Sequence, residues 1–192
     1  MTRAVATIVL LALLLLACGQ QATFKGTELQ DPPPAPDFTL TDQYGRPFRL
    51  SDQKGRVVLL FFGYTNCPDV CPTTLSVWQQ VETQLGKDAE KVRFVLITAD
   101  PERDTPDRLR EHLARFSPNF VGLTGTPQEL APVYEAYHAY VEKDAEGETA
   151  AGYLVNHTAA TFVVDPQGRW RLTIPFGTPA EDVVHDVRLL LP

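Results

Sequence analysis

The sequence has few cysteines, no cluster of basic residues and no hydrophobic run long enough to span a bilayer comfortably. Its 192 residues include 17 Lys and Arg against 24 Asp and Glu, which gives a formal net charge of −7. Without a basic run, nonspecific nucleic-acid binding is excluded, because that binding depends on clustered positive charge. The chain shows no internal repeats, and its length fits one domain with additional terminal segments.

The longest apolar run, at the N-terminus, is typical of an export signal. Residues 8–16 are apolar and follow Arg3, as in a positive n-region and a short h-region. Ala17 then precedes Cys18, and this order resembles the lipobox of bacterial lipoproteins, whose cysteine is diacylated. We therefore predict a lipoprotein signal peptide over residues 1–17 and membrane anchoring through Cys18, on the extracytoplasmic (periplasmic) side. The alternative is an ordinary signal peptide or membrane anchor with an incidental cysteine.

The next segment is rich in proline. Residues 18–36 include Asp-Pro-Pro-Pro-Ala-Pro at positions 31–36, which favours extended polyproline geometry. We predict that this segment is a lipid-anchored tether and that the folded domain spans residues 37–192.

Within that domain, strand and helix patterns alternate. The apolar pattern predicts strands at residues 57–62, 92–99, 161–164 and 170–173, and helices at 72–85, from about 105, at 127–140 and at 180–191. One hairpin is expected at residues 38–40 and 48–50, another joins the strands at 161–164 and 170–173, and an exposed loop is expected at 142–152. The pattern predicts an α/β fold with a central mixed sheet flanked by helices and an N-terminal hairpin.

Two cysteines remain once Cys18 is assigned to the lipid anchor. Cys67 and Cys71 lie in the loop between a buried strand and a helix, where open α/β sheets place their sites. Pro72 suits the first helical turn, so we expect Cys71 at the N-cap, where the helix dipole favours a thiolate. Three residues separate the pair instead of the two found in thioredoxins. The pair could close a disulfide, hold a metal ion or alternate between the two.

Copper is the metal that this donor set favours. Two thiolates select Cu(I) or zinc, and an added imidazole also suits Cu(II). A closed zinc site would need a fourth protein ligand, and no further cysteine is available. His157 precedes the strand expected at 161–164, and in thioredoxin-like topologies that loop faces the cysteine loop. From the residues alone His157 is either a ligand or a packed side chain.

The other candidate side chains have less specific patterns. We expect His112 on the surface, His138 either packed or functional, and His185 in the last helix. Asp100 and Asp104 could line the site or cap the following helix, and we favour capping.

Several ordered motifs resemble the Sco/SenC proteins of cytochrome oxidase assembly. They are Gly-Tyr-Thr-Asn-Cys-Pro-Asp-Val-Cys-Pro at 63–72, Asp-Pro-Glu-Arg-Asp-Thr-Pro at 100–106, Phe-Ser-Pro at 116–118, Gly-Leu-Thr-Gly-Thr at 122–126 and Asn-His-Thr at 156–158. The resemblance implies a thioredoxin-like fold and copper, Cu(I) or Cu(II), bound by Cys67, Cys71 and His157. It implies cytochrome c oxidase subunit II, with its binuclear CuA site, as the partner. Many members have Asp where this chain has Asn156, which removes a carboxylate that could support the histidine.

Two functions use the same sulfur atoms and stay open. One is a metallochaperone that delivers copper to CuA. The other is a thiol–disulfide oxidoreductase that keeps the CuA cysteines reduced through a mixed disulfide at Cys67 and Cys71. A peroxidase is disfavoured because nothing points to an Arg beside Cys67, and a purely structural disulfide would close too small a loop to stabilise much. We expect a monomer.

Overall fold

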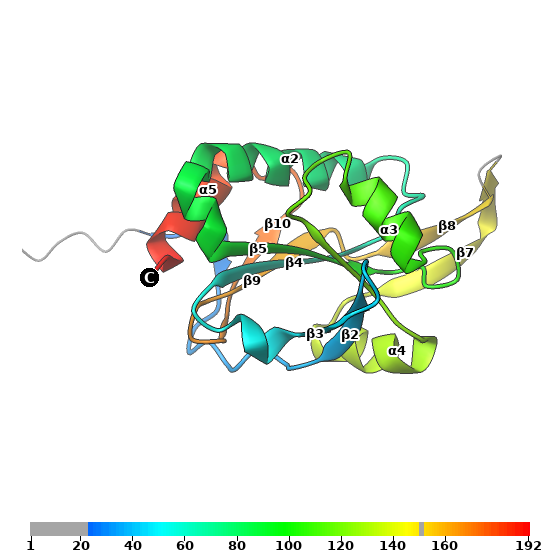
Figure 1. The fold of residues 1–192 in the computed structure, drawn as a ribbon, viewed down its shortest axis with the longest axis horizontal. Helices are drawn as coiled ribbons and strands as arrows, with labels where there is room; N and C mark the ends of the chain where they lie inside the picture. Colours follow the sequence, from blue (N-terminus) through cyan, green and yellow to red (C-terminus); the bar gives the residue numbers. More distant parts are fainter. Residues whose placement is uncertain (1–22, 150–151) are drawn as a thin grey trace, which may run out of the picture.

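The computed structural model of the protein describes residues 23–149 and 152–192 (Figure 1). The predicted signal peptide and Cys18 lie outside these residues. Within the two described ranges, no helix is long and apolar enough to cross a membrane.

A mixed eight-stranded sheet forms the centre of the molecule, as predicted, in the order β1-β10-β9-β4-β5-β6-β2-β3. Its parallel centre consists of β4 (Val57–Gly63), β5 (Val92–Thr98) and β6 (Val121–Thr124). The strands around that centre are antiparallel to their neighbours: β1 (Thr27–Glu28), β2 (Thr39–Asp42), β3 (Pro47–Arg49), β9 (Ala160–Val164) and β10 (Trp170–Pro175). The predicted hairpins β2–β3 and β9–β10 are therefore confirmed.

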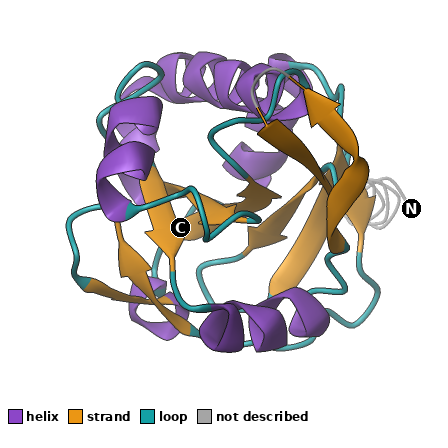
Figure 2. Cartoon of the chain, turned by 90° about the vertical axis from the view of Figure 1, so that its right-hand side faces the viewer, coloured by secondary structure: helices purple, strands orange, loops and turns teal. Residues whose placement is uncertain are grey.

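Helices cover both faces of the sheet (Figures 1 and 2). One face carries α2 (Val70–Leu85), α3 (Pro106–Leu113) and α5 (Ala180–Leu190), and the other carries α4 (Pro127–Ala136). Short 3-10 turns follow β3 and α2, at Leu50–Gln53 and Gly86–Lys91.

The apolar run of β4 is explained by this double cover. Alternate side chains of a strand point to opposite faces, so Val57, Leu59 and Phe61 pack under α2, α3 and α5. Their neighbours Val58, Leu60 and Phe62 pack on the α4 side. Burial of each such side chain contributes about 1.5–3 kcal/mol, which fixes the strand that leads to the cysteine loop.

The packed chain begins earlier than the predicted boundary at residue 36. Strand β1 pairs with β10, and the backbone N–H groups of Lys25 and Gly26 donate to the buried carboxylate of Asp186 at 2.8 and 2.7 Å. Pro34 bridges to Arg169 farther along the same edge. The proline-rich stretch therefore lies along the sheet edge instead of standing free. Prolines are tolerated there because an edge strand can leave one side unpaired.

Helix α4 ends four residues before the predicted end at 140. Its last residue is Ala136, and His138 then takes a left-handed conformation with φ 51°. A left-handed residue just after a helix commonly ends it. The helical pattern of apolar residues continues through this region, so it does not indicate where the helix ends.

The described part of the predicted exposed loop at 142–152 is strand; residues 150 and 151 lie outside the described residues. Strands β7 (Val141–Thr149) and β8 (Gly152–His157) pair as an antiparallel hairpin that makes a separate two-stranded sheet. The hairpin projects beyond the main body (Figure 1). The segment is charged because a projecting hairpin is exposed to water, and it therefore lacks the apolar pattern that predicts a strand.

Candidate metal centre

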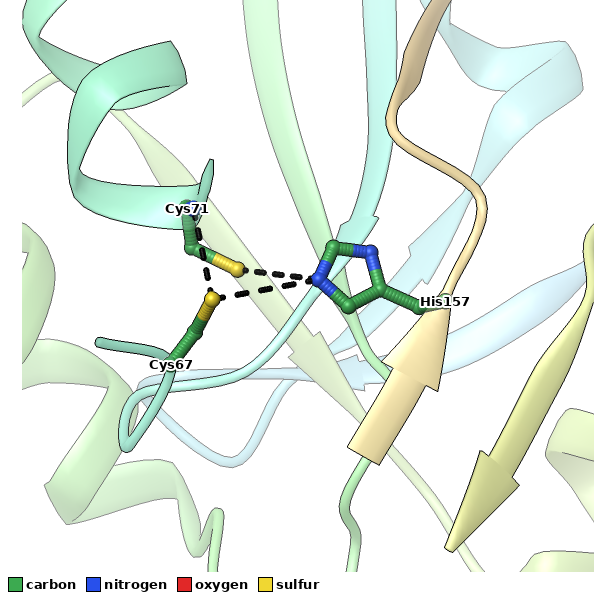
Figure 3. A group of neighbouring side chains, drawn as sticks. All are labelled: Cys67, Cys71 and His157. Atoms are coloured by element: carbon green, nitrogen blue, oxygen red, sulfur yellow. Dashed lines mark hydrogen bonds between the residues drawn. The ribbon is translucent and has the colours of Figure 1, made fainter. Parts of the chain in front are cut away.

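Three elements bring the predicted side chains Cys67, Cys71 and His157 together (Figure 3). Cys67 lies in the loop after β4, Cys71 in the first turn of α2, and His157 at the end of β8. The Nε2 atom of His157 is 3.4 Å from Sγ of Cys71 and 3.9 Å from Sγ of Cys67. All three potential donor atoms lie within 4.8 Å of one another. Within the described chain, no other group of three or more His, Cys, Asp and Glu donors meets the same spacing.

The helix start differs from the prediction. Asp69 is the N-cap of α2, and Cys71 lies inside the first turn with its side chain buried. The backbone N–H of Cys71 donates to Sγ of Cys67 at 3.4 Å. The backbone N–H groups at the helix start therefore stabilise negative charge on the sulfur of Cys67, which lies outside the helix.

This arrangement separates the two thiols chemically. The hydrogen bond from the Cys71 thiol is the main factor that lowers the pKa of Cys67 to about 4, opposed by partial burial. Burial, together with the neighbouring Cys67 sulfur, raises the pKa of Cys71. Cys67 is half-buried and Cys71 is fully buried. The expectation that the helix dipole would make Cys71 the thiolate is therefore wrong, and Cys67 is the accessible thiolate.

Asp104 holds the loop that carries Cys67. Its carboxylate accepts hydrogen bonds from the Thr65 N–H at 3.1 Å, the Thr65 hydroxyl at 2.6 Å and the Thr98 hydroxyl at 2.7 Å. The actual cap of α3 is Thr105, whose hydroxyl accepts from the N–H of Arg108 at 3.2 Å. The capping role that we favoured for Asp104 is therefore wrong, because this fully buried carboxylate ties the cysteine loop to β5.

Asp100 does not cap the helix with its side chain either. It is buried, and its carboxylate accepts a hydrogen bond from the hydroxyl of Tyr153 at 2.7 Å and pairs with the guanidinium of Arg103. The acidic residues that follow β5 thus face the cysteine loop and the β7–β8 hairpin.

Gly63 belongs to the site, although in the sequence it is only the first residue of the motif at 63–72. A Cβ atom at this position would lie 2.9 Å from Sγ of Cys71 and 2.7 Å from the ring of Phe61. Only glycine lets the strand pass this close to the sulfur. The available signal was a glycine at the end of a buried strand, immediately before the cysteine loop.

Two aromatic rings support the imidazole of His157. Phe61 and Tyr64 contact it edge-on, with ring centroids at 5.6 and 5.8 Å. Its Nδ1 atom lies 3.3 Å from the carbonyl oxygen of Thr158. Because a carbonyl can only accept, a proton on Nδ1 would satisfy this contact and leave the Nε2 lone pair for a metal ion.

Asn156 stands apart from this cluster. It is exposed, and the alternation of β8 places it on the opposite face from His157. The backbone carbonyl of Thr158, and not a neighbouring carboxylate, orients the imidazole here. The imidazole of His157 therefore keeps a hydrogen-bond partner although residue 156 is Asn and not Asp.

The remaining histidines lie outside the cluster. His112 is buried against Phe116, so the expectation of a surface residue is wrong. Burial lowers the pKa of His112 to about 4, which keeps it neutral. His138 is exposed, and His185 in α5 pairs with Asp186 at 2.9 Å.

The fold and the cluster together define a class: a thioredoxin-like protein with a Cys-x-x-x-Cys pair and a histidine from a distant strand at one site. The SCO1/SenC family model matches residues 26–191. The chain belongs to the SCO1/SenC family, which confirms the resemblance given by its motifs.

Solved structures agree in fold. Thermus thermophilus apo Sco1 is 39% identical, with a TM-score of 0.79 over 90% of this chain and 100% of that one. Bradyrhizobium japonicum ScoI, solved with copper bound, is 38% identical, with a TM-score of 0.75 over 82% of this chain and 99% of that one. BsSco, described with a disulfide switch and as a member of the Sco family of cytochrome c oxidase assembly proteins, is 26% identical, with a TM-score of 0.67 over 85% and 98%.

Curated relatives are longer than the matched region. A SCO2-like protein of Rickettsia felis is 36% identical over 134 residues, which make up 70% of this chain and 65% of that protein. The chain thus spans just under two thirds of that relative's length.

Proposed function

We propose that this protein binds copper through Cys67, Cys71 and His157 and serves as a metallochaperone for the CuA site of cytochrome c oxidase subunit II. The observation that carries the proposal is the convergence of two sulfurs and one imidazole nitrogen within 4.8 Å. Thiolates prefer Cu(I), and the imidazole makes the set suitable for Cu(II) as well. The copper-bound relative with the same fold, ScoI of Bradyrhizobium japonicum, supports the choice of metal.

The exposure of the donors fits delivery better than storage. Cys71 is buried and held by the fold, whereas Cys67 is half-exposed. An incoming thiolate of a target can therefore approach the metal from the side of Cys67 while Cys71 still holds it. The description of BsSco as an oxidase assembly protein supports subunit II as that target.

Copper binding and transfer test the proposal directly. The reduced, metal-free protein is loaded with Cu(I) in competition with a chelator and with Cu(II) under spectroscopic observation, then mixed with a copper-free CuA domain. We expect one copper per chain and its appearance on the target. Cys67→Ser and Cys71→Ser should each abolish tight binding, and His157→Ala should mainly weaken Cu(II), because two thiolates already satisfy Cu(I). His138→Ala, at an exposed histidine, is the matched control. Wild-type protein that binds no copper would disprove the proposal.

A thiol–disulfide reductase is the second candidate, and one observation favours it. The two thiols are chemically unequal, with an accessible Cys67 whose pKa is about 4 and a buried Cys71 whose pKa is raised. In such a pair the Cys67 thiolate attacks a target disulfide and forms a mixed disulfide. Cys71 then loses its proton and attacks Cys67, which releases the target dithiol and leaves the pair oxidised.

Counting thiols on the target separates the two functions. The reduced, copper-free protein is mixed with a subunit II domain whose CuA cysteines are joined in a disulfide. Target thiols that appear in proportion to oxidised Cys67 and Cys71 would establish the reductase. A His157→Ala variant that loses Cu(II) binding but still reduces the target disulfide would favour the reductase as the main function.

The proposal also includes a membrane anchor at Cys18 and a monomeric protein. Lipidation of Cys18 would hold the domain on the extracytoplasmic side of the membrane, and a lipoprotein from Bacillus anthracis of the same family supports it. Membrane fractionation of the wild type and of Cys18→Ser tests the anchor. Sedimentation of the protein tests the expected monomer.

A further inference from the structure

One face of β8 contacts the body at three successive positions. Side chains two apart along a strand share a face, so Tyr153, Val155 and His157 all point inward. His157 meets the cysteines, and the N–H of Val155 donates to the hydroxyl of Tyr64 at 3.1 Å. Tyr153 is the third contact, at the end of the strand away from the site.

Tyr153 is held by several groups at once. Its hydroxyl donates to the buried carboxylate of Asp100 at 2.7 Å and lies 3.0 Å from Glu102. The guanidinium carbon of Arg103 lies 3.7 Å from the centre of its ring, and Nζ of Lys143, across the hairpin, lies at the same distance. Arg103 also pairs with Asp100, so the carboxylate, the guanidinium and the phenol form one connected group.

We propose that Tyr153 is a positioning residue whose attachment to Asp100 and Arg103 fixes the β7–β8 hairpin on the body and thereby sets the place of His157 opposite the two cysteines. The inference rests on the proposed copper-binding function. The hairpin is a sheet of its own, separate from the main one. The contacts that β8 makes with the body therefore have to hold this strand, which carries His157, in place.

The same network connects two motifs that are distant in the sequence. Asp100 and Arg103 follow β5 in the segment whose Asp104 anchors the cysteine loop. One short segment thus positions both halves of the site. Asp104 holds the loop of Cys67 by hydrogen bonds, and Asp100 with Arg103 holds the strand of His157 through Tyr153.

Tyr153→Phe tests the proposal with little risk to the fold, since it removes the hydroxyl and keeps the ring. Tyr140→Phe is the matched control: it removes a hydroxyl that bonds Glu142 near the same hairpin, but its side chain is exposed. Arg103→Lys is the second variant, because it keeps the charge and loses the planar contact with the ring. Hydrogen exchange of the β7 and β8 amides is measured on the metal-free protein, and the Cu(II) signal by electron paramagnetic resonance.

We expect Tyr153→Phe and Arg103→Lys to speed amide exchange in β8 by about tenfold. Both should alter the nitrogen hyperfine signature of Cu(II) and weaken Cu(II) binding relative to Cu(I), whereas Tyr140→Phe should match the wild type. Exchange in β8 and a Cu(II) signature that stay unchanged in both variants would overturn the proposal. If the wild type binds no copper, the copper function fails, and the exchange of the metal-free protein still decides whether Tyr153 holds the strand of His157.

Discussion

Gly63 and Cys71 approach each other so closely that a Cβ atom on the glycine would lie 2.9 Å from the cysteine Sγ. The same atom would lie 3.0 Å from the side chain of Leu96 on the neighbouring strand. The sulfur therefore occupies space that any other residue at position 63 would fill. The end of β4 sets the depth at which the buried thiol lies.

Gly63→Ala should damage both the copper site and the stability of the fold. The added methyl group must displace the Cys71 sulfur or the strand, and such overpacking costs about 1–3 kcal/mol. We expect Cu(I) affinity to fall by more than about tenfold, measured by chelator competition, with a parallel loss in the free energy of unfolding. Gly45→Ala is the control: its φ of 74° makes it a strained substitution as well, but no atom lies within 4 Å of the added Cβ. Equal copper affinities in the two variants would contradict the prediction.

Asp104→Asn should loosen the loop that carries Cys67. The carboxylate accepts from three donors of Thr65 and Thr98, and the amide NH₂ of Asn would oppose at least one of them. An unsatisfied buried group of this kind costs about 1–3 kcal/mol. Urea denaturation should give this loss, and Asp107→Asn, at an exposed position on α3, should change stability by much less. If Asp104→Asn unfolds at the same urea concentration as the wild type, Asp104 does not hold the loop.

The reduced protein should carry a thiolate at neutral pH. Cys67 has a pKa of about 4 in the folded state against an ordinary value of 9.0. Between these values the folded state holds the thiolate and the unfolded chain the thiol, so the free energy of unfolding rises with pH across this window. That contribution is complete above the unfolded pKa and is lost as pH falls through about 4. The ultraviolet absorbance of the thiolate, titrated in the wild type and in Cys67→Ser, checks this. A titration midpoint near 9 would refute it.

Asp186→Asn should release the N-terminal segment from the sheet edge. The buried carboxylate accepts from the backbone N–H groups of Lys25 and Gly26, and an amide can accept only one of them well. We expect faster hydrogen exchange in β1 and a stability loss of about 1–3 kcal/mol. Asp52→Asn, at an exposed position, controls for the change in charge. If β1 exchanges at the wild-type rate, another contact holds the segment.

Local patterns determined much of this protein. The apolar run of β4, the start of α3 near residue 105 and the hairpin β9–β10 are set by residues near in sequence, so the sequence predicted them. The cysteine pair with three intervening residues, and a histidine before a late strand, likewise pointed to the site that the structure assembles.

Only the tertiary structure decided what depends on burial and on distant partners. Cys67 rather than Cys71 is the accessible thiolate because the helix start lies two residues earlier and buries the second sulfur. Asp104 holds a loop instead of capping a helix because Thr65 approaches it from another element. The charged segment after α4 belongs to a hairpin, on which Tyr153 meets Asp100 and Arg103, about fifty residues away in the chain. Such long-range contacts leave no periodic trace in the sequence, since each depends on where the completed fold places its partner.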